Sequence, residues 1–366
     1  MEDHDLIAQS ARELLDREFD RDALYAAFEG GGTDAQRLWD IALRMGWNGV
    51  AVPEELGGLG LDARAAVALL KEYGRAAVPG ALLSAAVGAL WSSSGTAADE
   101  GLRDVAARLG RGELRPLIPG FDWSSALRLD GGLVGGVLSG MVGGQGSDSA
   151  ILPARRGGED VLVVVPLDGR RCLFTPDDAW DRSRAVGALT CDGTAPLAVI
   201  ADHAHTGLQR LRTVMRLALA ADSVGGIERL LDMTTAYTRL REQFGRPVGS
   251  FQAVKHRLAT MYIELQPAMR LLELATDALV RNHQDAGLWA AIAKAEACEV
   301  YAKAAEESVL LHGGVGFTWE FDCHIYLKRV RLNACLAGDV RVSRDAAWQT
   351  LVEASREGRS TMEFAA

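Results

Sequence analysis

Apolar positions follow a helical repeat at both ends of the chain and a strand-like pattern in its middle. Residues 11–28, 34–47 and 62–78 place apolar side chains every three or four positions, which predicts amphipathic helices. Between the second and third of these helices, VAVPEELGGLGL at 50–61 is punctuated by Pro and Gly and predicts a loop. Asp62 then stands where it can open the third helix.

The pattern changes after about residue 112. Glycines cluster there, and two short β-branched runs follow, VLVVVPL at 161–167 and PLAVI at 196–200. These runs have the length and composition of strands and are bounded by turn residues. We therefore expect a small antiparallel β-domain.

From Gly207 onward the chain is strongly helical again, with breaks at FGRPVGS, near 282–287 and at HGGVGFT. The order helices, strands, helices indicates an α+β protein and not an alternating βαβ one. We expect an N-terminal helical domain at 1–112, a middle β-domain at 113–204 and a C-terminal helical bundle at 205–366.

Composition narrows the class of protein. The 366 residues include 39 Lys and Arg against 49 Asp and Glu, a formal net charge of −10, which argues against the basic surface of a nucleic-acid binder. The five cysteines are odd in number and form no CxxC pair, which favours a reducing cytoplasm over a disulfide framework or zinc site. The N-terminus has no signal-like apolar stretch and no run of about 18 apolar residues occurs, so we expect no secretory signal and no membrane span. No metal motif or nucleophile triad is visible.

The first motif with chemical content is R-x-x-F-G followed by F-Q, from Arg241 to Gln252. We expect one helix to end near Phe244, with the arginine in its last turn, and Ser250 to cap the next helix. An arginine in that place either compensates the helix dipole or offers its planar guanidinium to a phosphate.

Two glycine-rich segments add to this motif. In HGGVGFT at 312–318, Gly313 and Gly314 end a long helix and either cap it or let a ligand approach closely. His312 beside them either touches that ligand or is satisfied by the backbone. PEELGGLGL at 53–61 is, on its own, a loop between helices.

Three tryptophans could lie in the core or line a pocket: Trp123, Trp180 and Trp319. We expect two of the three to lie in the core.

Together and in this order, the motifs resemble the acyl-CoA dehydrogenase family of flavoproteins over nearly the whole chain. The resemblance implies an N-terminal helical domain, a middle β-barrel-like domain and a C-terminal four-helix bundle. It also implies FAD at their junction and assembly into dimers or tetramers. In the implied reaction a carboxylate base removes the α-proton of an acyl-CoA thioester, and the β-hydrogen leaves as hydride to flavin N5.

The chain departs from the family pattern at the base. Most members carry a Glu in a Y-E-G-T-like motif before the last helix, and the aligned residue here is Ala337. Some relatives carry it on the first helix of the C-terminal bundle, and that position is Met215, followed by Arg216. Asp339, two residues past Ala337, is a weak candidate because its side chain is shorter and displaced.

The flavin-ring side of the β-domain departs as well. The family motif T-E-P-x-x-G-S-D, whose Thr and Ser contact the flavin, is reduced here to LIPGFDWSSALRL at 117–129. The segment aligned with the family's W-x-T is Gly140-Met141-Val142. GSDS at 146–149 better matches a strand edge, so Asp148 is interpreted as a turn residue. Asp181-Arg182-Ser183 is interpreted as structural pairing within the β-domain.

The motifs that survive belong to the other half of the cofactor site. In the family each FAD lies across a subunit interface. One protomer supplies the β-domain and base, and its neighbour supplies the R-x-x-FG and GG-x-G elements. A Gln common near the adenine is replaced here by Leu310. The resemblance assigns FAD contacts to five residues: Arg241, Phe244, Gln252, Gly313 and Gly314.

These departures favour a non-catalytic subunit of an α2β2 acyl-CoA dehydrogenase. It would complete the FAD site of a homologous partner that carries the base and binds the acyl-CoA substrate, with an electron-transfer protein as the acceptor. The sequence HGGVGFTWE and the Ala- and Arg-rich composition resemble those of actinobacterial enzymes that act on steroid-CoA thioesters. A steroid-derived acyl group is therefore the hypothesis for the substrate.

Two other classes of function stay open. One is a self-sufficient homo-oligomeric dehydrogenase with an unusual base, for which Asp339, Asp222 and Glu228 are candidates. A variant of this reading is a member with different flavin chemistry, such as remote desaturation. The other is a flavin-free structural or regulatory homologue.

Overall fold

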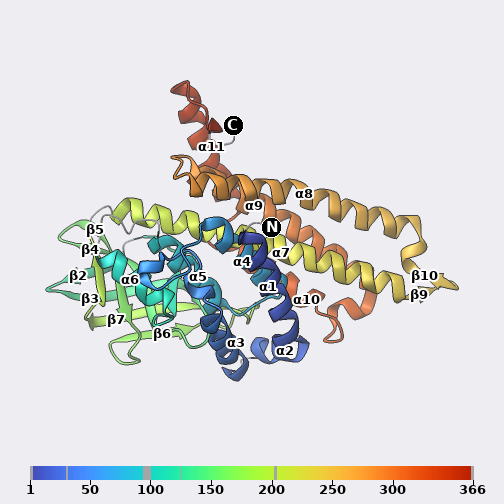
Figure 1. Ribbon diagram of the computed structural model, residues 1–366, viewed down its shortest axis with the longest axis horizontal. Coiled ribbons are helices and arrows are strands. Elements are labelled where there is room, and N and C mark those ends of the chain that lie inside the picture. Colours follow the sequence, from blue (N-terminus) through green and yellow to red (C-terminus); the bar gives the residue numbers. More distant parts are fainter. Residues whose placement is uncertain (1–2, 30–31, 94–99, 125, 202–203, 364–366) are drawn as a thin grey trace. The chain divides into compact units, whose positions relative to one another are not determined.

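The computed structural model describes residues 3–29, 32–93, 100–124, 126–201 and 204–363. Helices come first along the chain, then strands, then helices again, as Figure 1 shows. This order confirms the α+β class. The chain forms two compact units, residues 1–69 with 78–215 and residues 70–77 with 216–366. The boundaries expected from the sequence stay a prediction.

In the described part of the chain, six α-helices precede the sheet. Asp62 accepts a hydrogen bond from the backbone N–H of Arg64 at 2.8 Å and so opens the fourth helix as predicted. The segment 50–61 before it is irregular apart from one short turn. The fifth helix is buried from Gly80 to Ser92, because it is apolar on all sides. The helices are α1 (Asp3–Glu18), α2 (Arg21–Phe28), α3 (Gly32–Arg44), α4 (Ala63–Arg75), α5 (Gly80–Ser93) and α6 (Glu100–Gly110).

Strands β1 to β8 form one sheet in the order β6-β7-β3-β1-β4-β5-β8, with β2 pairing with β3 and β4. Most neighbours are antiparallel, as expected, but β1 and β2 each run parallel to β4. The sheet is therefore mixed, and the expectation of purely antiparallel pairing was wrong on this point. The strands are β1 (Pro116–Pro119), β2 (Leu127–Asp130), β3 (Leu133–Gly143), β4 (Ser149–Arg156), β5 (Glu159–Pro166), β6 (Cys172–Pro176), β7 (Ala185–Thr194) and β8 (Ala198–Ile200).

Alternation along the strands builds the core of this sheet. Val161, Val163 and Val165 of β5 lie in one buried cluster with the alternate residues of β4 opposite them, because side chains two apart share a face. Helices α5 and α6 pack against the sheet at β1, β3 and β8. The two β-branched runs seen in the sequence are thus β5 and β8.

The C-terminal helices are long. In Figure 1, α8 lies along α9, and the small hairpin of β9 (Glu242–Gln243) and β10 (Arg246–Pro247) joins α7 to α8. The described part of this region has five α-helices where the resemblance implies a bundle of four. None of the described helices is long and apolar enough to cross a membrane. The five are α7 (Ala204–Leu240), α8 (Gln252–Val280), α9 (Ala286–His312), α10 (Cys323–Cys335) and α11 (Val340–Arg356).

The last turns of α4 lie directly against α7, and glycines allow this approach. A Cβ placed on Gly225 would stand 1.9 Å from the carbonyl oxygen of Lys71, and one on Gly74 would stand 2.0 Å from that of Asp222. Beside this crossing, Lys71 pairs with Glu228 at 3.2 Å. Backbone-to-backbone contact of this kind has no room for a methyl group.

An aromatic cluster holds the end of α9. The His312 ring stacks on Tyr237 with centroids 4.2 Å apart and lies 5.0 Å from the Phe321 ring. His312 Nδ1 lies 2.7 Å from the Ser308 carbonyl, the bond expected of a neutral imidazole that donates there. Burial lowers the pKa of His312, and this hydrogen bond opposes the shift. Of the two interpretations of His312, contact with a ligand or a bond to the backbone, the structure supports the bond to the backbone.

Three local expectations were wrong. Arg241 lies one residue past the end of α7, because the chain turns into the hairpin there. Ser250 does not cap α8: the helix begins at Gln252 after Phe251, and no described atom bonds the buried Ser250 hydroxyl. Trp180 and Trp319 are 67% and 54% exposed and Trp123 is half-buried, so the three tryptophans lie outside the fully buried core.

Replacing Gly225 with Ala tests the close crossing. Because the new methyl would overlap the Lys71 carbonyl, we expect a loss of about 1–3 kcal/mol in the free energy of unfolding. The matched control is Gly88→Ala in α5, whose nearest neighbours are flexible leucine and isoleucine methyls at 3.3 Å. Urea unfolding measures both variants, and equal loss in the two would contradict the assignment.

The buried imidazole predicts a pH dependence of stability. The folded pKa of His312 lies below its ordinary value of 6.5, so below that pH the unfolded chain takes up a proton that the folded chain does not. The free energy of unfolding should therefore fall as the pH falls below 6.5. In His312→Asn, which cannot titrate, thermal melts from pH 7.5 to 5 should show a shallower loss. An unchanged slope would exclude His312 as the source.

Candidate functional site

The R-x-x-FG motif forms a tight β-hairpin. Gln243 pairs with Arg246 across it, which leaves Phe244 and Gly245 as a two-residue turn. Both turn residues have positive φ, +54° and +75°, as the favoured hairpin turn requires, and glycine adopts this conformation without strain. The Phe244 ring projects into solvent with 92% of its surface exposed.

Tyr237 joins this hairpin to the glycine pair. Its carbonyl accepts the backbone N–H of Arg241 at 2.8 Å, and its hydroxyl donates to the carbonyl of His312 at 3.1 Å. His312 directly precedes Gly313, so Tyr237 contacts both predicted motifs: Arg241 through its backbone carbonyl and His312 through its side chain. The sequence analysis missed Tyr237. Its position one helical turn before Arg241 is the signal that would have found it.

The glycine pair ends α9 as predicted and leaves open space. Gly313 has φ +68° and terminates the helix, and both glycines are exposed. A Cβ added to Gly313 or Gly314 would meet nothing within 4 Å. Within this chain the glycines are therefore not needed for packing, which fits a surface that a ligand or another chain approaches.

A cavity of about 660 Å³ lies beside Arg241. Its wall is one face of α7, at helical spacing from Arg229 to Leu240, together with Phe321. The Arg241 side chain is exposed, and no described residue bonds its guanidinium. Arg241, Phe244, Gln252, Gly313 and Gly314 are all solvent-exposed at this end of the helices. These residues offer a cation, open backbone and aromatic surface, which fit the phosphate and adenosine parts of a dinucleotide.

The two positions at which the sequence analysis expected a base hold buried apolar side chains. Ala337 and Met215 both have no exposed surface. Ala337 lies in the turn after α10 with φ +55°, and its carbonyl accepts a hydrogen bond from Arg216 Nε at 3.1 Å. The turn therefore presents a methyl group where most members carry a carboxylate.

A second buried cation holds the same turn. The Lys294 ammonium donates to the carbonyls of Ala334 and Gly338 at 2.8 and 2.6 Å. Burial lowers the pKa of Lys294, while its place at the end of α10 favours the cation through the helix dipole. The sequence analysis did not find this residue, because a lysine inside an amphipathic helix gives no signal of burial.

The three candidate alternative bases all have structural partners. Asp339 caps α11 by accepting the backbone N–H of Val342 at 2.7 Å. Asp222 is fully buried against Arg329, and Glu228 pairs with Lys71. Each carboxylate is thus engaged in holding helices, the ordinary role for these residue types.

The segment aligned with the family's W-x-T motif, Gly140-Met141-Val142, has no hydroxyl or aromatic side chain to contact a flavin ring. Met141 and Val142 of β3 are fully buried, and Gly140 turns with φ +70°. Asp148 accepts the backbone N–H of Arg115 at 2.8 Å and the hydroxyl of Ser149 at 2.9 Å. This supports its interpretation as a turn residue.

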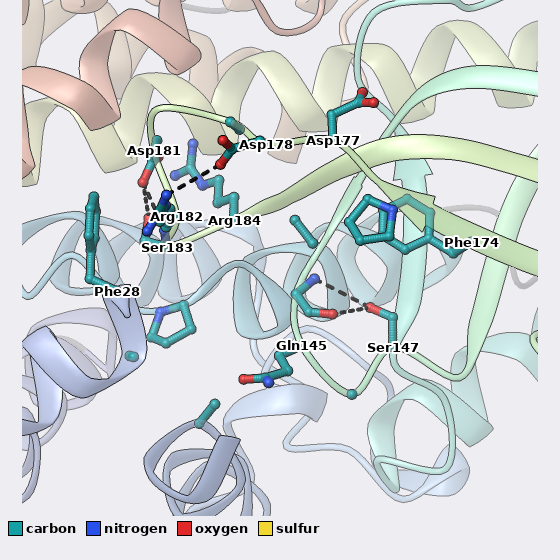
Figure 2. A pocket seen from close by; sticks show the side chains of 18 of the residues that line it. Phe28, Gln145, Ser147, Phe174, Asp177, Asp178, Asp181, Arg182, Ser183 and Arg184 are labelled. Carbon is teal, nitrogen blue, oxygen red and sulfur yellow. Dashed lines mark hydrogen bonds and ion pairs between the residues drawn. The ribbon is translucent and has the colours of Figure 1, made fainter. Parts of the chain in front are cut away.

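A cavity of about 600 Å³ opens beside β6 and β7 (Figure 2). Asp181 on its wall accepts the backbone N–H and the hydroxyl of Ser183 at 3.0 and 2.6 Å, which supports a structural role for this segment. Gln145 and Ser147 lie on the loop below, and Phe174 lies on the far side. Among the residues described, no cluster of His, Cys, Asp or Glu has the makings of a metal site.

Comparison with known proteins places this geometry in a family. The model of the acyl-CoA dehydrogenase N-terminal domain matches residues 1–113, and that of the C-terminal domain matches residues 208–351. The acyl-CoA dehydrogenase IpdE2 of Mycobacterium tuberculosis is 30% identical over 92% of this chain and 93% of its own length. IpdE2 of Mycolicibacterium smegmatis is 28% identical over 93% and 96%.

Solved structures agree in fold. A variant of the Tcur3481-Tcur3483 steroid acyl-CoA dehydrogenase superimposes with a TM-score of 0.85 at 27% identity, covering 96% of this chain and 98% of that one. The ChsE4-ChsE5 complex from Mycobacterium tuberculosis superimposes with a TM-score of 0.80 at 24% identity over 95% and 97%. With the matched N- and C-terminal models and the full-length relatives, the conclusion is that this chain belongs to the acyl-CoA dehydrogenase family.

Proposed function

We propose that this chain is the non-catalytic subunit of a heteromeric, FAD-dependent acyl-CoA dehydrogenase. It completes the FAD site of a homologous partner chain, which carries the base and binds the acyl-CoA. The observation that carries the proposal is the pairing of two features. The expected base positions are the buried, apolar Ala337 and Met215, while the residues around Arg241 that the resemblance assigns to FAD are present and exposed.

The missing base follows from elementary chemistry. Removal of a thioester α-proton needs a carboxylate within hydrogen-bond reach of that proton. Neither a methyl group at Ala337 nor the thioether of Met215 accepts a proton. Arg216 and Lys294 hold the surrounding turn through its carbonyl groups. This favours a turn that is kept for its shape and not for acid–base chemistry.

The retained motifs support a role toward a cofactor held jointly with another chain. Arg241 would hold the pyrophosphate through charge-assisted hydrogen bonds, and Gly313 and Gly314 would let the cofactor approach the backbone. Phe244 and Gln252 would contact it from the hairpin and the start of α8. FAD, when bound, supplies the hydride acceptor; the proton-accepting group comes from the partner. An electron-transfer protein is the proposed acceptor.

The substrate class is inferred from relatives. One structural neighbour is described as a steroid acyl-CoA dehydrogenase of two named chains, and another is the ChsE4-ChsE5 complex. By similarity we extend to this chain a steroid-derived acyl-CoA thioester as substrate. We also propose an α2β2 assembly with half the usual number of flavins, because the two kinds of chain would each supply one half of a site. The site on this chain contributes only to the cofactor side.

The two rival functions have less support. A self-sufficient enzyme would need a free carboxylate. Asp339 instead caps α11, and Asp222 and Glu228 each pair with a basic residue of another helix. A flavin-free scaffold would not need an exposed arginine beside two glycines that no packing requires. Flavin content distinguishes all three functions.

The first test is the number of flavins per chain. The protein is purified alone and after co-expression with a homologous chain that carries the glutamate, and flavin absorbance is compared with protein concentration. We expect no flavin alone and about one FAD per two chains in the complex, since the two half-sites are complementary. One FAD per chain in the protein alone would establish the self-sufficient enzyme. No flavin in either sample would favour the scaffold.

Within the same complex, Arg241→Ala should release FAD. Loss of charge-assisted bonds to a phosphate costs about 1.5–3 kcal/mol, or roughly a ten- to hundredfold weaker retention. Arg270→Ala is the control, because Arg270 is also exposed but pairs with Glu273 on α8. Flavin occupancy after gel filtration measures the effect, and equal occupancy in both variants would remove the phosphate assignment.

Ala337→Glu should not create an active enzyme. The new carboxylate would occupy the family's base position, yet the ring-side contacts near Gly140, Met141 and Val142 would still be missing. Turnover of steroid-CoA thioesters by the variant chain without its partner is therefore expected to stay at the level of Ala337→Gln. Strong turnover by the Glu variant alone would show that this chain's own β-domain supports catalysis.

A further inference from the structure

Two cysteines face each other across the end of the sheet. Strand β6 stands at one end of the strand order, and its pairing with β7 sets Cys172 directly opposite Cys191. Their sulfur atoms lie 3.3 Å apart. Both side chains are buried, in the same core cluster.

The type of pairing brings these sulfurs together. The neighbouring pair is hydrogen-bonded, since the Asp192 N–H donates to the Arg171 carbonyl at 2.7 Å. Cys172 and Cys191 are therefore a non-hydrogen-bonded pair, in which Cα atoms lie only about 4.5 Å apart. Disulfides span Cα separations of about 4.4–6.8 Å, so a bond between these sulfurs needs little movement of the backbone.

The backbone around Cys172 is firmly held. One carboxylate oxygen of Asp168 accepts the N–H groups of Arg170, Arg171 and Cys172 at 2.8–2.9 Å. The Thr194 hydroxyl donates to the Arg171 carbonyl at 3.0 Å. These bonds lock the start of β6 in register with β7, so the two thiols are kept in contact instead of meeting by chance.

The pKa values of the two thiols are shifted in opposite directions. The hydrogen bond between the sulfurs raises the pKa of Cys172, which burial raises further, and it lowers the pKa of Cys191. The reactive form of either sulfur is its thiolate. The other cysteines lie elsewhere: the Cys298 sulfur lies against the Ser223 hydroxyl, Cys323 against His312, and Cys335 is exposed.

A route for a small oxidant exists. The cavity of about 600 Å³ beside β6 has Cys172 among its lining residues, with Phe174 two residues along the same strand (Figure 2). A hydroperoxide is small and uncharged and can enter such a space, whereas a bulky protein thiol cannot reach a side chain without exposed surface.

We propose that Cys172 and Cys191 form a redox modification site, which a hydroperoxide converts into a cross-strand disulfide. One of the two sulfurs, as its thiolate, attacks a peroxide oxygen, the O–O bond breaks, hydroxide leaves and that cysteine becomes a sulfenic acid. The other sulfur then attacks the sulfenic sulfur, the S–S bond forms, and hydroxide leaves with the second cysteine's proton as water. Two thiols are oxidised and one peroxide is reduced to two waters, or to water and an alcohol.

The experiment is peptide mapping of the full-length chain after treatment with hydrogen peroxide and alkylation of the remaining thiols. Trypsin cuts after Arg171, Arg182 and Arg184, so each cysteine falls in its own peptide, 172–182 or 185–210. We expect the two peptides to be joined, with a mass lower by two hydrogens than their sum, and to separate after treatment with dithiothreitol. The disulfide should also raise the melting temperature, because it constrains the unfolded chain.

Two variants control the assignment. Cys191→Ala should abolish both the joined peptide and the rise in melting temperature, whereas Cys335→Ala, at the exposed cysteine, should change neither. If both peptides remain separately alkylated under peroxide that oxidises Cys335, the proposal is overturned. That comparison uses the unmodified chain and does not depend on the folding of any variant.

Discussion

The buried ion pair between Asp222 and Arg329 ties α10 to α7. Neither side chain has exposed surface, and the Arg329 guanidinium reaches both carboxylate oxygens, at 2.6 to 3.2 Å. Asn333 donates to the same carboxylate at 2.7 Å. Losing one partner of such a pair costs about 3–5 kcal/mol, because the other charge is left buried. A hydrophobic pair would hold two helices together as well, so what this pair adds is a fixed register of α10 on α7.

The turn after α10 depends on that register. Once α10 is fixed, its last carbonyl groups lie within reach of Lys294 and Arg216, and both cations bond backbone oxygen atoms there. Ala337 sits in this turn with a left-handed backbone and a buried methyl group. The shape of this turn is therefore kept by bonds to backbone carbonyl groups that do not involve the Ala337 side chain.

Features that depend on a local residue pattern, such as helices and their caps, could be predicted from the sequence. Features that depend on the pairing of distant segments could not. Helix spacing, the loop at 50–61, the capping role of Asp62 and the glycines that end α9 could all be read from residue types alone. The hairpin around Phe244 could not, because two-residue strands have no periodicity. Ser250 misled for a related reason: a good capping residue has no effect when the backbone enters the helix one residue later. The parallel neighbours of β4 and the contact of Cys172 with Cys191 need a register that no single segment contains.

The candidate site could be predicted only as far as its motifs. Arg241 and the glycine pair were singled out through the family resemblance, since each of them alone also had an ordinary structural interpretation. Tyr237, which joins them, looks like any residue on a helical face. The exposed tryptophans were misplaced because apolar composition does not distinguish a core from a surface that a second molecule covers.

Several large apolar side chains near the predicted motifs are exposed. Leu240, Phe244, Leu310 and Phe317 are each more than half exposed on the C-terminal unit, and they neighbour the motif residues in sequence. Evolution rarely keeps large apolar side chains in water around glycines that no packing requires, since the exposed area costs solubility without stabilising the chain. The exposed Arg241 guanidinium lies at the edge of the same region, where an anionic group of another molecule could reach it. These features fit the proposed role of the surface in contacts outside the chain.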